Sequence, residues 1–309
     1  MSEKKSFKNA LNDCLNEAVA KDDSIVLVSA DSGPNSGFKE FITDHPEKYF
    51  ECGIAETAAE SLCSGLATTG LTPIFCAPSP FSVGRAYEFF RIDLGYMRQN
   101  VKIIGRNCGF SYNDLGPTHY GLDDIALVNE IPEVMILAPQ DADEMEHCFK
   151  AMLEHKGPVY MRVHNNSLVV PEEKREFDIN KAVIYEEGED IAIISTGNET
   201  EFVWKALDEI KAAGVKPTVI GIHTLSPIDK DAIRLAAKTG KVVTVEEHFA
   251  NGGLGSIVAN VLAEECPAKL RKIAVPNIYC TSGPYDELSH LYGLDPEGIA
   301  KTVIEFAKE

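Results

Sequence analysis

The stretch Gly53-Ile54-Ala55-Glu56-Thr57-Ala58-Ala59-Glu60 opens a predicted helix that continues through Leu62 and ends near Gly70. The apolar run from Pro73 to Ala77 follows that glycine and predicts a buried strand, and Ile25 to Ser29 predicts another strand ahead of the helix. Because a helix that separates two short apolar runs is typical of a parallel sheet, this region predicts an α/β fold.

The alternation of apolar runs and helical segments continues outward along the chain. A first set of predicted strands is completed by Val101 to Gly105, Val134 to Ala138 and Val159 to Val163, and a second set comprises Ile191 to Ser195, Pro217 to Ile222, Lys241 to Val245 and Ile273 to Pro276. A charged segment without periodicity, which begins at Pro171, separates the two sets. We therefore predict two doubly wound α/β domains, residues 1–170 and 183–309, joined by a linker at residues 171–182.

The composition narrows the class of protein. Of the 309 residues 44% are hydrophobic, and 48 Asp and Glu outnumber 29 Lys and Arg, for a formal net charge of −19. An acidic surface of this kind argues against nucleic acid or membrane as a partner. The eight cysteines have neither Cys-x-x-Cys nor zinc-type spacing, so we expect no metal site in this chain. A polar start and the lack of a run of about 18 apolar residues lead us to expect a cytoplasmic protein.

Two residues with chemically useful side chains have informative positions. Glu56 falls in the first helical turn among small and apolar residues, which predicts a buried carboxyl group, although a solvated carboxylate that complements the helix dipole is the alternative. His119 ends the segment Asp114-Leu115-Gly116-Pro117-Thr118-His119, on a loop beyond the carboxyl end of a predicted strand. Open α/β sheets bind ligands at that edge, so His119 is a candidate site residue.

The order and spacing of several motifs resemble those of the carboxyl-terminal half of transketolase, over nearly the whole chain. In particular, the chain resembles the separate C-terminal subunit of split transketolases. The matching segments are Gly53-Ile54-Ala55-Glu56, Arg85-Ala86-Tyr87, Gly116-Pro117-Thr118-His119, Asp123-Asp124-Ile125-Ala126, Ala138-Pro139-Gln140-Asp141, Gly157-Pro158-Val159-Tyr160-Met161-Arg162, Val245-Glu246-Glu247-His248 and Gly252-Gly253-Leu254-Gly255. The resemblance implies a thiamine-diphosphate pyrimidine-binding domain followed by a transketolase C-terminal domain.

The resemblance also implies roles for individual residues. Glu56 falls on the glutamate that hydrogen-bonds N1′ of the aminopyrimidine, and Phe81 on the aromatic residue that stacks on that ring. His119 falls on the histidine that contacts the donor sugar. Other positions that the resemblance places near the cofactor are Asp31, Ile54 and Arg85. For Phe81 the alternative is an ordinary core phenylalanine.

The cofactor's metal and diphosphate are held in this family by a Gly-Asp-Gly motif with a downstream Asn in the amino-terminal half. This chain contains no Gly-Asp-Gly. The resemblance therefore implies an N-terminal partner subunit that carries the motif and holds magnesium and diphosphate, and an α2β2 assembly that is active only when both subunits are present.

The chain departs from the family where transketolases bind the phosphate of their sugar substrates. Asn35, Asn107 and Asn165 align with a Ser, a His and an Arg of the family's phosphate site, and Leu115 and Pro78 replace an aspartate and an aromatic residue. Asparagine carries no charge and cannot form the bidentate clamp of Arg. The three asparagines therefore predict a non-standard ketose, branched, sulfonated or unphosphorylated, unless the partner subunit supplies the charge.

Three alternatives to a transketolase subunit remain open at this point. The β subunit of a 2-oxo-acid dehydrogenase has the same two domains but lacks the Gly-Pro-Thr-His loop. A 1-deoxyxylulose-5-phosphate synthase shares that loop but has about twice this length. A non-catalytic paralogue would keep the fold and lose the activity, and the presence of Glu56 and His119 argues against it.

Overall fold

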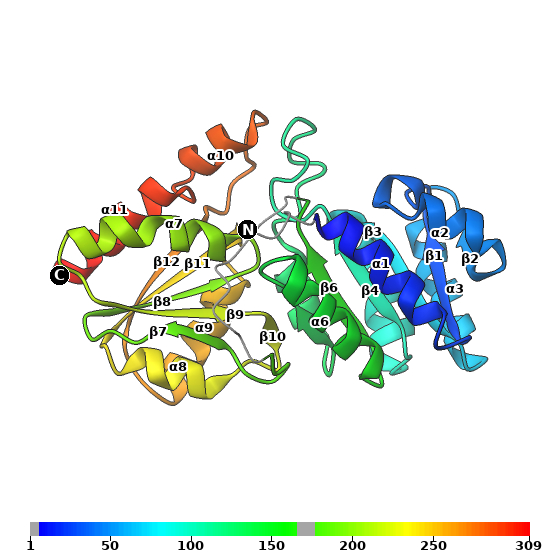
Figure 1. Ribbon diagram of the computed structural model, residues 1–309, viewed down its shortest axis with the longest axis horizontal. Coiled ribbons are helices and arrows are strands. Elements are labelled where there is room, and N and C mark those ends of the chain that lie inside the picture. Colours follow the sequence, from blue (N-terminus) through cyan, green and yellow to red (C-terminus); the bar gives the residue numbers. More distant parts are fainter. Residues whose placement is uncertain (1–5, 166–176) are drawn as a thin grey trace.

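Each apolar run that predicts a strand overlaps a strand of the computed structural model, which describes residues 6–165 and 177–309. Two α/β lobes lie side by side, the first formed by the amino-terminal residues and the second by the carboxyl-terminal residues (Figure 1). The predicted class, two doubly wound α/β units, is confirmed.

The first lobe is built on a sheet of seven strands. Their order across the sheet is β10 (Thr224–Ser226), β5 (Met135–Leu137), β6 (Val159–Val163), β4 (Lys102–Arg106), β3 (Thr72–Pro78), β1 (Ile25–Ser29) and β2 (Tyr49–Glu51). The pairs from β5 to β2 are parallel, whereas β10 pairs antiparallel with β5. The parallel strands carry their carboxyl ends to one edge, where a doubly wound sheet binds ligands.

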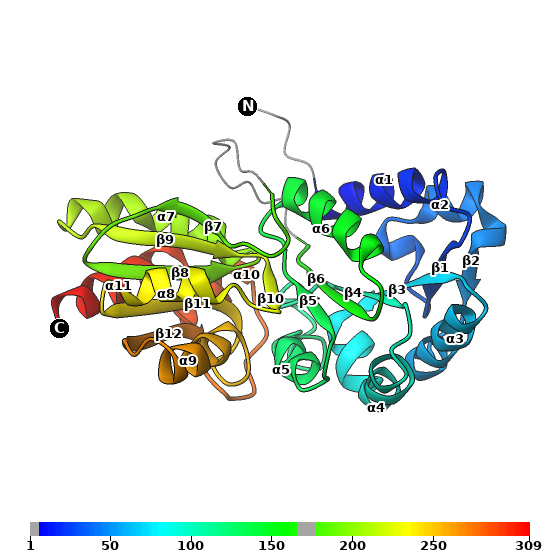
Figure 2. The same cartoon turned by 90° about the horizontal axis from the view of Figure 1, so that it is seen from below.

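Helices cover both faces of this sheet. One face carries α1 (Phe7–Val19), α2 (Lys39–Asp44) and α6 (Ala142–Glu154), and the other carries α3 (Glu56–Thr68), α4 (Tyr87–Phe89) and α5 (Asp124–Asn129) (Figure 2). Side chains of neighbouring strand residues point to opposite faces, so Leu27 packs in the core under α1 and α6 while Val28 packs in the core on the other face. This double burial explains why the strands are continuous apolar runs.

The second lobe has a five-stranded sheet. Its order is β12 (Lys269–Val275), β11 (Lys241–Phe249), β8 (Ile191–Thr196), β9 (Pro217–Ile222) and β7 (Val183–Glu186), with β7 antiparallel to β9. In Figure 1, α7 (Glu199–Ala212) and α11 (Pro296–Lys308) lie on one side of it, and α8 (Lys230–Ala237) and α9 (Leu254–Glu264) lie on the other. The helix α10 (Tyr285–Leu291) lies near the first lobe's long loops.

Three strands were not predicted: β2, β7 and β10. Each has three or four residues, and β2 and β7 are only partly buried, so none forms an apolar run. The strand β10 also qualifies the proposed domain boundary, because a segment of the second lobe completes the first lobe's sheet. Half of the proposed linker, residues 171–176, lies outside the described residues.

None of the helices within residues 6–165 and 177–309 has the length and apolar character needed to cross a bilayer.

Candidate functional site

Glu51, the last residue of β2, holds together the loops that lead into the site. Its Oε1 accepts hydrogen bonds from the backbone N–H of Asp31 at 2.7 Å and of Gly53 at 2.7 Å. Asp31, two residues after β1, adopts a left-handed φ of 53°, which aspartate tolerates better than most residues. Glu51 thus fixes the segment that precedes Glu56, a role that the sequence did not reveal because β2 is too short to predict.

Glu56 begins α3, as predicted, and its side chain is buried, with 4% of the residue exposed. The Arg85 guanidinium donates to both carboxylate oxygens, at 2.8 and 2.9 Å. The same guanidinium lies over the ring of Phe81, 4.1 Å from its centroid. Phe81 and Arg85 share the π-helical segment Pro80–Arg85, which follows β3 and brings both side chains to Glu56. Such segments are frequent at functional sites.

His119 lies next to this group, on the loop after β4. Its ring makes a T-shaped contact with the ring of Phe81 at a centroid distance of 5.1 Å and another with the ring of Tyr112 at 5.7 Å. The Nδ1 atom is 2.9 Å from the hydroxyl of Thr118. We call Glu56, Phe81, Arg85 and His119 the Glu56 cluster: side chains from three separate segments of the sequence that are contiguous in the fold.

The three asparagines also come together. Asn35, Asn107 and Asn165 line one small pocket at the carboxyl ends of β1, β4 and β6. Asn107 is buried and has a left-handed φ of 54°, a conformation in which asparagine is enriched. We call this pocket, with its further lining residues Lys8 and Arg106, the asparagine pocket. The resemblance to the family suggested that the three asparagines belong to one site, but it did not suggest Arg106.

Two predicted residues lie at the exposed margin of the site. Ile54 is 76% exposed, an unusual state for a large apolar side chain beside a buried carboxylate. Leu115, on the loop that leads to His119, is 50% exposed. Apolar side chains exposed around a site often mark a surface that another molecule covers.

Glu60 lies one helical turn after Glu56 and was not predicted as special. It is fully buried, and neither carboxyl oxygen has a hydrogen-bond partner within the described residues. Burial and the nearby Asp93 raise its pKa well above the ordinary value. Burial therefore favours the neutral form of the Glu60 carboxyl group, which has no cation beside it in the part of the chain that the structure describes, whereas Glu56 has Arg85.

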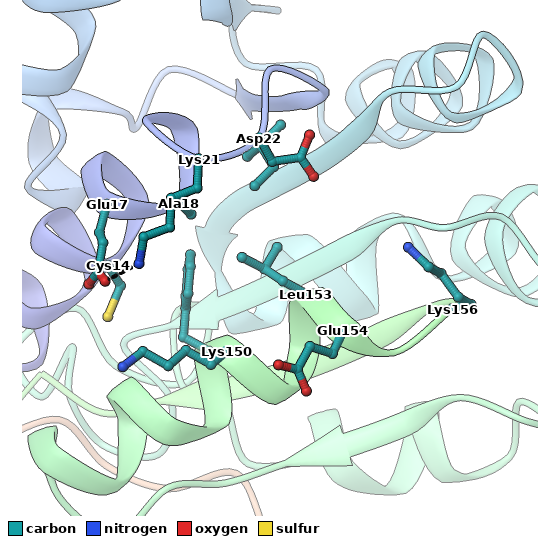
Figure 3. A pocket seen from close by; sticks show the side chains of 11 residues that line it. Cys14, Glu17, Ala18, Lys21, Asp22, Lys150, Leu153, Glu154 and Lys156 are labelled. Atoms are coloured by element: carbon teal, nitrogen blue, oxygen red, sulfur yellow. Dashed lines mark hydrogen bonds and ion pairs between the residues drawn. The ribbon is translucent and has the colours of Figure 1, made fainter.

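A larger cavity of about 370 Å³ lies between α1 and α6, lined by residues such as Cys14, Phe149 and Leu153 (Figure 3). Ile25, the first residue of β1, also lines it, so this cavity lies at the amino ends of the strands. No predicted site residue belongs to it, and ligand chemistry is expected at the opposite edge.

Comparisons with known proteins decide the family. The family described as the transketolase pyrimidine binding domain matches residues 3–170, and that described as the transketolase C-terminal domain matches residues 180–299. The chain belongs to the transketolase family. It is a C-terminal subunit of a thiamine-diphosphate-dependent transketolase, the enzyme that transfers a two-carbon ketol unit from a ketose to an aldose.

Individual relatives support the split-subunit organisation. The chain is 36% identical over 305 residues to one subunit of the apulose-4-phosphate transketolase of Phocaeicola vulgatus, with 98% of this chain and 97% of that protein covered. It is 32% identical over 295 residues to a 6-deoxy-6-sulfo-D-fructose transketolase subunit of a Clostridium species, with 95% and 92% covered. A solved split-gene transketolase, described as an inactive beta4 tetramer, superposes with a TM-score of 0.88 at 31% identity and 98% coverage of both chains.

Proposed function

We propose that the Glu56 cluster binds the aminopyrimidine of thiamine diphosphate, with Glu56 on N1′ and Phe81 against the ring. The observation that carries this proposal is the position of Arg85. Its flat, nitrogen-rich guanidinium contacts the Phe81 face at 4.1 Å and donates to the Glu56 carboxylate at 2.8 Å. An aminopyrimidine needs the same two contacts, one with a ring face and one with a carboxylate. The cluster therefore fits an aminopyrimidine in the place that the guanidinium occupies.

The Arg85 side chain can move away from Glu56 and Phe81 when the pyrimidine binds, because 44% of it is exposed to solvent. Glu56 then keeps its buried place and shares a proton with N1′. A carboxyl group shielded from water is suited to this exchange, because little solvent competes for the shared proton. When bound, thiamine diphosphate supplies the electron sink for cleavage of the carbon–carbon bond beside the ketose carbonyl.

His119 faces the sugar in this proposal. Its Nδ1 is engaged with the Thr118 hydroxyl, and no contact of Nε2 is seen within the described residues. Nε2 is therefore the atom that exchanges protons with donor hydroxyl groups. Asp31, at the loop that Glu51 anchors, and the exposed Ile54 lie at the cofactor side of the site.

We further propose that the chain acts with an N-terminal partner subunit in an α2β2 assembly. This chain lacks Gly-Asp-Gly, and magnesium and diphosphate would be held mainly by the partner. The exposed Ile54 and Leu115 beside the site, and Tyr96 with 82% exposure, offer apolar surface for it. That a similar split-gene transketolase is described as an inactive beta4 tetramer supports the need for a partner.

The proposed compartment is the cytoplasm. None of the eight cysteines, all of which lie in the described residues, forms a disulfide, and most of them are buried, which suits a reducing environment.

The proposal of a partner is tested by binding measurements on the chain alone and on the complex. Calorimetry of the isolated chain should detect no tight binding of thiamine diphosphate with magnesium, whereas the chain co-purified with a Gly-Asp-Gly subunit should bind both. Light scattering should give the mass of an α2β2 species. Submicromolar binding by the isolated chain would show that this chain holds the diphosphate and metal by itself.

A further inference from the structure

Arg106 is a buried cation without a counter-charge. It ends β4, and only 8% of the residue is exposed. Its Nη1 donates to two neutral acceptors, the Asn107 side-chain oxygen at 3.1 Å and the Tyr112 hydroxyl at 2.9 Å. Its Nε has no acceptor, and no carboxylate pairs with it anywhere in residues 6–165 or 177–309. Removing a charge from water is costly unless an opposite charge compensates, so this guanidinium suits an anionic ligand.

The pocket around Arg106 has the charge that an anion requires. Its described lining contains a second cation, Lys8 of α1, together with the three asparagines and no carboxylate. This absence is notable in a chain with 48 acidic and 29 basic residues. The asparagine amides can add neutral hydrogen bonds, while the two cations supply charge that the asparagines lack.

The asparagine pocket is linked by contacts to the Glu56 cluster. Tyr112 accepts from Arg106 at 2.9 Å, and its ring lies 5.7 Å from that of His119. His119 in turn contacts Phe81. Arg106 is thus connected through Tyr112 to His119, the member of the Glu56 cluster that is proposed to face the sugar.

We propose that Arg106 is the residue that selects for a terminal oxyanion, phosphate or sulfonate, on the sugar substrate. This inference rests on the proposed function of the site. From the end of β4, Arg106 supplies the positive charge that Asn35, Asn107 and Asn165 lack. Asn107 is a positioning residue in this scheme, because its side-chain oxygen accepts from Arg106 Nη1.

The test compares substrates that differ only in the terminal anion. In the complex with its partner, thiamine diphosphate and magnesium, kcat/KM is measured for D-xylulose 5-phosphate and for D-xylulose with one fixed acceptor. We define the substrate ratio as kcat/KM for D-xylulose 5-phosphate divided by kcat/KM for D-xylulose. This ratio should fall roughly tenfold to a hundredfold in Arg106→Gln, since a charge-assisted contact is replaced by a neutral one. Arg106→Lys should recover part of the ratio, and Arg91→Gln, which alters an exposed arginine, serves as the matched control.

A second measurement does not depend on turnover. Methyl phosphate and methanesulfonate are titrated into the same complexes, and the tighter probe identifies which oxyanion the pocket prefers. Binding of that probe should weaken at least tenfold in Arg106→Gln relative to Arg91→Gln. If the substrate ratio and probe binding are both unchanged in Arg106→Gln, the proposal is wrong. If no ketose reacts but probe binding still depends on Arg106, the proposed function fails and the anion site stands.

Discussion

At the scale of single residues, the difference between Glu56 and Glu60 yields a sharp test. Both glutamates are buried on α3, but Glu56 contacts Arg85 and Glu60 has no partner within the described segments. We expect Glu56→Gln to preserve assembly and to slow exchange of the cofactor's thiazolium C2 proton by several orders of magnitude, because the amide keeps the shape and loses the shared proton. The rate is measured by NMR after dilution of the complex into deuterated water.

The matched control for that experiment is Glu60→Gln. Burial raises the pKa of Glu60 well above its ordinary value and so favours the neutral form, which a glutamine amide resembles in shape and charge. This variant should exchange the C2 proton at nearly the native rate. If the Glu56→Gln complex exchanged the thiazolium C2 proton at the native rate, the role assigned to Glu56 would be wrong.

At the scale of secondary-structure elements, Glu246 of β11 caps α9. Its two oxygens accept from the backbone N–H of Leu254 at 2.6 Å and of Gly255 at 2.7 Å. Burial nevertheless raises the pKa of Glu246 to about 7. The folded state therefore binds this proton more tightly than the unfolded state, whose value is near 4.5. Stability from this group is present below about pH 4.5 and is lost as pH rises through about 7.

Glu246→Gln should remove that pH dependence. The free energy of unfolding of the native chain, minus that of Glu246→Gln, should fall between pH 4.5 and pH 8 by on the order of 3 kcal/mol. His248, whose pKa burial lowers to about 4, has the opposite dependence but is present in both proteins and cancels in the difference. Urea unfolding of both proteins at several pH values measures the difference in their free energies of unfolding. A difference that does not change with pH would contradict a raised pKa at Glu246.

At the scale of the whole molecule, Arg162 joins the two lobes. From β6 it donates through Nε to Asp124 at 2.9 Å and through Nη2 to the backbone oxygen of Glu247, in the second lobe, at 2.7 Å. Arg162 and Asp124 are both almost fully buried. Arg162→Met removes the cation beside the buried Asp124 carboxylate, which keeps its hydrogen bond from Tyr160, and we expect a loss of about 3 to 5 kcal/mol in the free energy of unfolding.

The control is Arg91→Met, which breaks an exposed pair with Glu88 three residues away. Exposed pairs contribute about 0 to 1 kcal/mol, so this variant should be nearly as stable as the native chain. Denaturant unfolding of both variants gives the comparison. Similar losses in the two variants would show that the buried contacts of Arg162 contribute no more to stability than an exposed ion pair.

The sequence by itself determined the class of fold and the start of α3 at Glu56, because both follow from patterns within a few residues: apolar runs, helical periodicity and a terminal glycine. It also predicted the candidates Glu56, Phe81 and His119, through motifs whose order is preserved. Only the tertiary structure decided that Arg85 lies on Glu56 and Phe81, that β10 completes the first sheet, and that Arg106 lies among three asparagines. These contacts depend on strand order, which brings together segments separated by tens of residues, and no local pattern encodes such a distance.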